Sequence, residues 1–310
     1  MKTFVVTGCN GFIGSHMCYE LRQSYPDCHI IGVDKVDKPH LRHLYDVYSP
    51  IDLSCNPLYT GAKEIDCIFH FAAYISVEEG ERDAWSYYRN NLGATFTAID
   101  FARQYGVKNF IFSSTAAVYG DSINPLAGHI METRPLNPVS VYGKTKAICE
   151  EILASTDLNV ARLRYFNACG RNAKANLNEE HDPETHLIPL LVRNKQATIY
   201  GDTWATKDGT CVRDYVHVID ICQAHISAYE YIRHGASIAC NIGTGKGHSV
   251  KEVVDKVNEI IHNGEMEISY DERRNGDVPY LVADTTTAET ILNFQPQYTL
   301  DDIIESMKNG

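Results

Sequence analysis

The sequence lacks any hydrophobic run of the ~18 residues that a membrane-spanning helix needs,. It also lacks a Cys-x-x-Cys pair, although it contains 10 cysteines. Scattered cysteines in a chain of 310 residues are typical of reduced core residues rather than disulfides or zinc ligands,. No signal-peptide pattern follows Met1,. We therefore expect a cytoplasmic protein with no bound metal.

Positive charge is scarce as well. The 28 lysines and arginines are outnumbered by 40 aspartates and glutamates, which gives a net charge of -12. This excess argues against nucleic acid or an anionic membrane surface as a partner. A small anionic substrate is still compatible with it, because charges beyond about 8 Å are screened and a few local arginines then dominate.

What the sequence does contain is a regular alternation of short hydrophobic strands and longer helices. Such βαβ units require a parallel sheet with both faces covered, so we predict an α/β fold of the Rossmann type, a doubly wound parallel sheet. The expected strands are residues 3–7, 29–33, 66–71, 109–112 and 160–164, and the expected helices are residues 13–24, 84–104 and 142–155.

The alternation stops after Asn167. Residues 169–183 are polar and end in proline, which is typical of a domain boundary,. We predict an NAD-binding domain at residues 1–168, to which residues 215–245 return, and a smaller α/β substrate domain at residues 169–310. The expected helices of this half are residues 187–195, 218–234, 250–262 and 300–307.

A glycine-rich turn, Gly8-Cys9-Asn10-Gly11-Phe12-Ile13-Gly14, joins the first strand to the first helix. Glycines allow backbone amides to approach a pyrophosphate, and the helix N-terminus adds partial positive charge. Asp34 ends the second strand, where a carboxylate binds ribose hydroxyls and repels a 2′-phosphate, so the cofactor expected is NAD. A similar segment, residues 243–247, lacks this context, and we interpret it as a structural turn.

Tyr142 and Lys146 stand four residues apart, hence on one helix face,. Thr115 lies at the carboxyl end of a strand, where open α/β sheets bind ligands. For Tyr142 to act as a base its pKa must fall from about 10 to near 7, about 4 kcal/mol, with help from the lysine and a nicotinamide ring. The pair Tyr59 and Lys63 has the same spacing but lies in a polar segment rich in turn residues, and we do not assign it.

Together with these residues, further motifs resemble the UDP-glucose 4-epimerase family, of the extended short-chain dehydrogenase/reductase superfamily, over nearly the whole chain. They are Val6-Thr7-Gly8, His70-Phe71-Ala72-Ala73, Ser113-Ser114-Thr115, Tyr142-Gly143-Lys144, Leu163-Arg164-Tyr165-Phe166-Asn167, Thr185-His186-Leu187, Tyr200-Gly201-Asp202, Val212-Arg213-Asp214 and Arg273-Arg274-Asn275-Gly276-Asp277.

The resemblance implies a homodimer that holds NAD tightly and interconverts UDP-glucose and UDP-galactose through a 4-keto intermediate, as in galactose metabolism. It implies Tyr142 as the base, assisted by Thr115 and Lys146, and a dimer interface on the helices expected at residues 84–104 and 142–155. The implied cofactor residues are Gly8, Gly11, Phe12, Ile13, Gly14, Asp34, Asp52, Leu53, Phe71, Ala72, Ala73, Asn90, Thr115, Tyr142, Lys146 and Phe166. The implied substrate residues are Thr115, Asn167, Leu187, Thr198, Tyr200, Arg213, Arg274 and Asp277.

The chain departs from the family pattern at two positions. Ile75 stands where many members have a lysine near the cofactor phosphates, and Leu281 stands where others have Tyr, Cys or Ser beside the sugar pocket. The sugar therefore stays open among UDP-glucose, UDP-N-acetylglucosamine, UDP-xylose and UDP-glucuronate.

Other interpretations of the same residues remain. A 4,6-dehydratase needs an acid and a base at the positions where this chain has Ala116 and Ala117. Alanine cannot transfer protons, so this activity is disfavoured. A non-catalytic NAD sensor would have no reason to combine Thr115 with the tyrosine–lysine pair. Arg213 could form an ion pair with Asp214 instead of binding a phosphate.

Overall fold

A computed structural model describes residues 1–62, 64–120, 128–180, 184–274 and 277–308. Its centre is a seven-stranded sheet in the order β10-β6-β5-β4-β1-β2-β3, and every neighbouring pair is parallel. The predicted doubly wound fold is confirmed. The strands are β1 (Thr3–Thr7), β2 (His29–Val33), β3 (Val47–Ser49), β4 (Cys67–His70), β5 (Asn109–Thr115), β6 (Asn159–Tyr165) and β10 (Ile238–Ile242).

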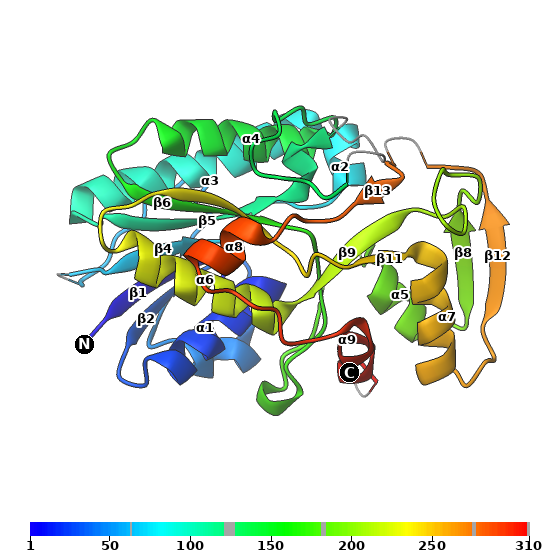
Figure 1. Cartoon of the computed structure of the whole chain (residues 1–310). Helices are drawn as coiled ribbons and strands as arrows, with labels where there is room; N and C mark the ends of the chain where they lie inside the picture. Colours follow the sequence, from blue (N-terminus) through cyan, green and yellow to red (C-terminus); the bar gives the residue numbers. More distant parts are fainter. Residues whose placement is uncertain (63, 121–127, 181–183, 275–276, 309–310) are drawn as a thin grey trace.

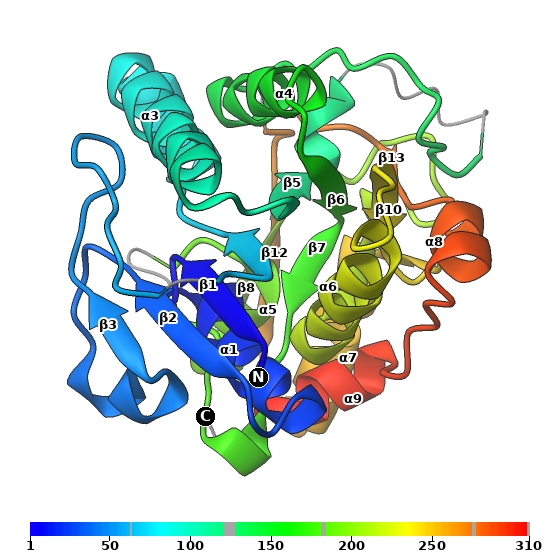
Figure 2. The ribbon, with the colours of Figure 1, turned by 90° about the vertical axis from the view of Figure 1, so that its left-hand side faces the viewer.

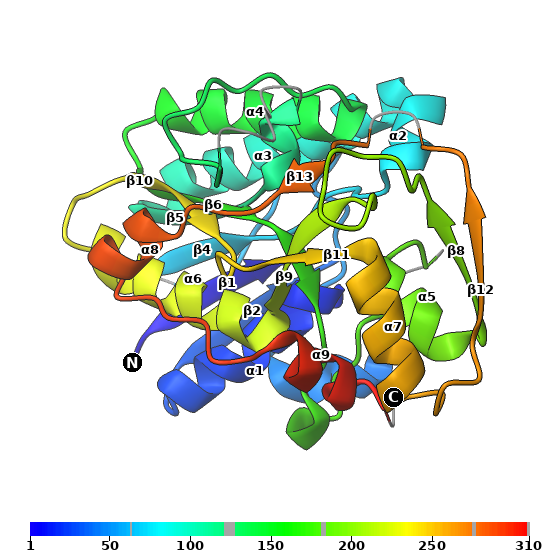
Figure 3. The same cartoon turned by 45° about the vertical axis from the view of Figure 1, so that its right-hand side comes forward.

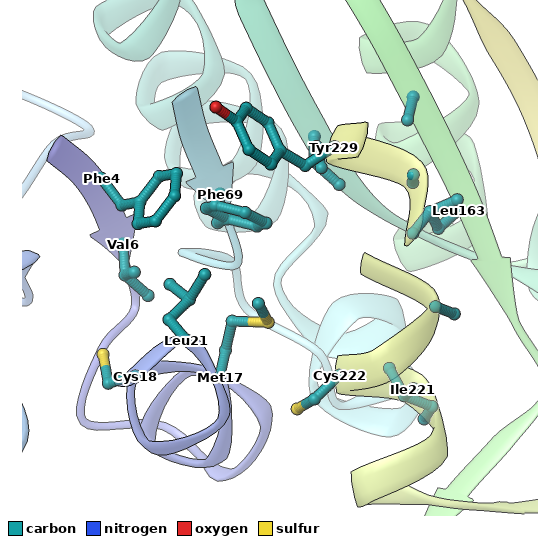
Figure 4. Close-up of a cluster of buried hydrophobic side chains, with 14 of the residues drawn as sticks. Phe4, Val6, Met17, Cys18, Leu21, Phe69, Leu163, Ile221, Cys222 and Tyr229 are labelled. Carbon is teal, nitrogen blue, oxygen red and sulfur yellow. The ribbon is translucent and has the colours of Figure 1, made fainter. Parts of the chain in front are cut away.

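Helices cover both faces of this sheet (Figures 1 and 2). On one face lie α1 (Phe12–Ser24) and α6 (Val218–Ile232), and on the other lie α3 (Ala84–Tyr105) and α4 (Val141–Ala154). Figure 4 shows the first interface, where Phe4 and Phe69 of the sheet meet Met17 and Leu21 of α1. Strands covered on both faces are apolar at most positions, which explains short hydrophobic runs such as Phe4–Val6 and Phe110–Phe112,.

On the opposite face, the sheet packs against α3 and α4, and α4 contains Tyr142. Ser140 caps its N-terminus, because its hydroxyl accepts a hydrogen bond from the Gly143 amide at 3.0 Å,. The neighbouring helix α3 begins at an Asp83 cap and ends at Gly106, whose φ of +68° favours glycine,. These local signals fix where each helix starts and stops, and therefore the depth at which the helix lies against the sheet.

The smaller part of the molecule lies beyond the carboxyl ends of the parallel strands (Figures 1 and 3). It contains one sheet of β7 (Asn167–Cys169), β9 (Val212–His217), β11 (Gly247–Ser249) and β13 (Tyr280–Leu281), and a second sheet of β8 (Gln196–Tyr200) and β12 (Glu267–Asp271). The helices α5 (Leu187–Arg193), α7 (Val250–Ile260) and α9 (Leu300–Ser306) pack with them around Ile199, Val253 and Ile303.

The chain passes between the two parts more than once. β9 belongs to the smaller part, and then α6 and β10 return to the seven-stranded sheet. Sequence patterns missed the three-residue strand β3 and the short helices α2 (Val77–Arg82) and α8 (Thr286–Ile291), because each is too short to show a period,. In the part of the chain that the structure describes, no helix is long and apolar enough to cross a membrane.

Candidate active site

The glycine turn lies at the carboxyl end of β1, at the point where the sheet order changes direction,. Gly8 has a φ of +69°, and a Cβ there would lie 2.9 Å from the Ala72 amide nitrogen. A Cβ on Gly14 would lie 2.0 Å from the Gly8 carbonyl oxygen. Only glycine fits at these two positions, so β1, α1 and the segment after β4 can approach one another closely.

The N-terminus of α1 suits a pyrophosphate. Its N-cap, Gly11, offers no side chain to cap the first amides, and the first turn contains no acidic residue. The amides of this first turn carry the positive end of the helix dipole, which favours an anion at this end of the helix. The turn therefore fits the dinucleotide for which the sequence predicts it.

Asp34 lies directly after β2 and is held in place by two amides. Its carboxylate accepts hydrogen bonds from the Asn10 amide at 3.0 Å and the Val36 amide at 2.9 Å. Burial raises the pKa of Asp34 above its ordinary value, although both bonds work in the opposite direction,. The amides orient the carboxylate at the end of β2, where a ribose would lie.

The remaining residues predicted around NAD line the same edge of the sheet. Asp52 and buried Leu53 follow β3, Phe71, Ala72 and Ala73 follow β4, and Asn90 lies on α3. The Phe71 and Ala72 amides both lie 3.2 Å from the Thr7 hydroxyl, which joins this segment to β1.

Burial raises the pKa of the Asp52 carboxyl, yet hydrogen bonds from Ser54 and the charge of Lys35 hold this pKa below its usual range. Phe12 and Ile13 lie in the first turn of α1, and Phe166 is buried between β6 and β7.

Thr115, Tyr142 and Lys146 come together where β5 ends beside α4. The Thr115 hydroxyl neighbours the half-buried Tyr142 phenol and acts to lower the pKa of that phenol. The buried Lys146 ammonium donates to the Ser113 carbonyl oxygen at 2.7 Å and lies 5.9 Å from the centre of the Tyr142 ring. A hydroxyl, a phenol and an ammonium thus lie together where β5 meets α4.

Burial shifts the pKa values of the two titratable groups, Tyr142 and Lys146. It raises the pKa of Tyr142 to about 12, against the effect of the nearby Thr115 hydroxyl, and lowers the pKa of Lys146 to about 8,. The lysine alone therefore does not bring about the acidification expected of Tyr142. The positive charge of a nicotinamide ring is the further contribution that the base would need.

Tyr59, of the second tyrosine–lysine pair, is 61% exposed, and Lys63 lies outside the described residues. The segment at residues 243–247 is a structural turn, as predicted. Its amides at Thr244 and Gly245 donate to the buried carboxylate of Asp214 at 2.8 and 3.0 Å, so they are already satisfied within the chain.

Apart from Thr115 on β5, the residues predicted to hold the nucleotide sugar lie in the smaller part. Thr198 and Tyr200 share one face of β8, since Ala197 and Ile199 point into the core,. The Arg274 guanidinium lies over the Tyr200 ring at 3.9 Å, a distance typical of a cation–π contact,. Leu187 opens α5 and Asn167 opens β7. Asn275 and Gly276 lie outside the described residues.

Arg213 on β9 forms its ion pair with Asp277, at 3.2 Å. The alternative pairing with Asp214 is wrong, because adjacent residues on a strand point to opposite sides of the sheet. Arg213 also donates to the Val278 carbonyl oxygen at 2.6 Å. Leu281 on β13 is paired in register with Arg213 and packs against the cluster that contains Phe166. Arg213 and Leu281 thus lie next to each other on paired strands.

Sequence patterns did not single out Lys35, which the structure places beside Asp52 and Asn90. Its only sequence signal is that it follows Asp34. No group of three or more His, Cys, Asp or Glu within the described ranges could hold a metal ion.

The fold and these residues define an α/β protein of the dinucleotide-binding class in which a tyrosine–lysine pair on α4 lies beside the carboxyl end of β5. Residues 4–243 match the NAD dependent epimerase/dehydratase family. UDP-glucose 4-epimerase of Rhizobium leguminosarum bv. trifolii is 36% identical, over 98% of this chain and 96% of that one.

Two solved structures are similar over nearly their full length. UDP-glucose 4-epimerase of Brucella ovis, in complex with NAD, has a TM-score of 0.89 and 34% identity, over 99% of this chain and 98% of that one. The UDP-Glc/GlcNAc 4-epimerase of Campylobacter jejuni has a TM-score of 0.82 and 31% identity, over 100% and 98%. The chain belongs to the NAD-dependent epimerase/dehydratase family and, within it, to the UDP-glucose 4-epimerases. The predicted isomerase class and NAD cofactor are confirmed.

Proposed function

We propose that the chain interconverts UDP-glucose and UDP-galactose in the cytoplasm, within galactose metabolism. The observation that carries this proposal is the group of Thr115, Tyr142 and Lys146 at the carboxyl end of β5, two strands away from the glycine turn that follows β1. The part built on the seven-stranded sheet would hold NAD, and the smaller part would hold the UDP-sugar.

NAD held by the glycine turn, Asp34 and Asp52 would supply the acceptor for the hydride of the sugar C4 and would return that hydride later. Tyr142 takes the proton of the C4 hydroxyl and gives it back after the 4-keto sugar has turned over. The Thr115 hydroxyl binds the same oxygen and orients it toward the phenol. Lys146, fixed by the Ser113 carbonyl, keeps a positive charge beside the base and so favours its ionised form,.

Epimerisation requires a firm grip on the nucleotide and a loose grip on the hexose. Arg213 and Arg274 suit the pyrophosphate, because a guanidinium binds phosphate oxygens in a bidentate manner. In the structure, Arg213 forms an ion pair with Asp277, and the Arg274 guanidinium lies over the Tyr200 ring. Leu187 and Thr198 would contact the uracil from α5 and β8, and Asn167 and Asp277 would contact the substrate.

Because Leu281 is neither Tyr nor a small residue such as Cys or Ser, UDP-sugars other than UDP-glucose are also candidate substrates. The Leu281 side chain is larger than Cys or Ser and lacks the ring of Tyr, and it lies next to Arg213 on β13. We expect UDP-glucose to be converted fastest. UDP-N-acetylglucosamine, UDP-xylose and UDP-glucuronate would turn over more slowly in separate incubations with product analysis.

The same incubations test the activity itself. Transient absorbance of reduced cofactor after addition of UDP-glucose, followed by UDP-galactose, would support the proposal. Binding of NAD with neither reduction nor product would favour a non-catalytic NAD sensor instead.

We also propose a homodimer that pairs through α3 and α4. These helices pack side by side, and α3 exposes Trp85 (76%) and Phe96 (50%), eleven residues apart and therefore on one helix face,. Large exposed apolar side chains of this kind are typical of interfaces.

The double substitution Trp85→Glu and Phe96→Glu is expected to convert a dimer to a monomer in sedimentation at micromolar concentration. Tyr270→Glu, a change of similar exposure on β12, should leave the dimer intact, and a wild-type monomer would contradict the proposal.

A further inference from the structure

Lys35 extends from the carboxyl end of β2 across the edge of the sheet. Its ammonium donates to the Tyr74 hydroxyl at 2.8 Å and to the Asn90 side-chain oxygen at 3.5 Å, and it lies 3.6 Å from an Asp52 carboxylate oxygen. These partners come from the segments after β4 and β3 and from α3. One side chain therefore links three segments that surround the candidate cofactor site.

The position of Lys35 follows the course expected of a bound dinucleotide. The adenosine ribose belongs at Asp34 and the pyrophosphate at the N-terminus of α1, which lies on one face of the sheet. Lys35 begins beside Asp34 and ends beside Asn90 on α3, which covers the opposite face (Figure 1). The phosphates would therefore pass between the amides of α1 and the Lys35 ammonium.

The ammonium has donor capacity left for such a ligand. It carries three donor protons, of which two are directed to Tyr74 and Asn90. Asp52, at 3.6 Å, is near enough to attract the charge but beyond hydrogen-bond distance,. The Lys35 side chain is 35% exposed, so a phosphate can reach it.

Ile75, next to Tyr74, is 45% exposed and brings no charge to the same edge. We propose that Lys35 binds the phosphates of NAD and supplies the positive charge that Ile75 does not. This inference rests on the proposed cofactor site, in which Asp52 and Asn90 line NAD. It assigns to the site a residue that neither sequence patterns nor the family resemblance marks.

The test compares ligand binding to the cofactor-free full-length chain by calorimetry. Lys35→Met keeps the length of the side chain and removes its charge. Loss of one charge-assisted hydrogen bond should weaken NAD and ADP binding about 10- to 100-fold. Adenosine, which has no phosphate, should bind as it does to the wild type, and adding Ile75→Lys should restore much of the NAD affinity.

Lys2→Met is the matched control. The Lys2 ammonium lies 4.3 Å from the Tyr25 ring centre, as Lys35 does from Tyr74, and it also forms an ion pair, with Glu230 at 3.1 Å. Lys2 precedes β1, at the opposite edge of the sheet. Its substitution should leave the binding of NAD, ADP and adenosine unchanged.

Provided that the wild-type chain binds NAD, three results would contradict the role of Lys35 and leave the proposed function standing. They are an unchanged NAD affinity in Lys35→Met, an equal loss for adenosine and ADP, and a loss confined to NADP, which would place Lys35 at a 2′-phosphate. Failure of the wild-type chain to bind NAD at all would instead overturn the proposed function together with this inference.

Discussion

Replacing Tyr142 with phenylalanine is expected to lower turnover at least ~100-fold, the usual scale for loss of a general base. The substitution removes the only atom that accepts the C4 proton in the proposed mechanism and keeps the ring in place. NAD and UDP should bind as in the wild type, because the turn at Gly8 and the residues on β8 and β9 are unaltered. Initial rates with UDP-galactose and calorimetry with NAD and UDP measure the two effects.

Tyr59→Phe serves as the control, since Tyr59 is 61% exposed and belongs to the segment between β3 and β4, not to β5 or α4. It should retain the wild-type rate. Rates close to wild type in the Tyr142 variant would exclude this residue as the base. A combined loss of activity and NAD binding would show that the phenol is needed to form the site and not only for proton transfer.

Replacing Arg164 with methionine is expected to lower the free energy of unfolding by about 3–5 kcal/mol, because it leaves a buried carboxylate without its partner. Arg164 on β6 and Glu150 on α4 form an ion pair of 2.6 Å in which the side chains are only 6% and 2% exposed. Glu150 also accepts a hydrogen bond from Ser114, and Arg164 donates one to Tyr119. Urea unfolding measures the change.

The matched comparison is Lys195 and Glu265, an ion pair of the same 2.6 Å length with side chains 63% and 65% exposed. Lys195→Met should cost at most about 1 kcal/mol, because exposed pairs are solvated and screened. The double variant Arg164→Met and Glu150→Met should recover much of the lost stability, since no buried charge remains. Equal losses at the two sites would refute the role of burial.

The buried pair also bears on the candidate active site. Glu150 lies one helical turn beyond Lys146, and Ser114 precedes Thr115. The Arg164–Glu150–Ser114 contacts therefore fix α4 against β5 at the level of the proposed catalytic trio. A modest movement of α4 in the Arg164 variant would appear as lower activity in addition to lower stability.

The sequence by itself determined the features that depend on neighbouring residues. Strand and helix periods, the Gly8 turn, Asp34 at the end of β2 and the shared helix face of Tyr142 and Lys146 all arise within a few residues of chain. Each is found in the structure where it was expected, within two residues at the ends, except that β5 continues three residues beyond its expected end, to Thr115. Because each family motif consists of neighbouring residues, the motifs can be recognised without any knowledge of the fold.

Only the tertiary structure decided which charges meet and how deeply they are buried. Arg213 pairs with Asp277 and not with its neighbour Asp214, and Lys35 reaches Asn90 across the sheet. Burial raises the pKa of Tyr142 to about 12, a shift that no spacing reveals. Such properties depend on groups far apart in the chain, because the electrostatic energy of a side chain is set by its whole surroundings in space.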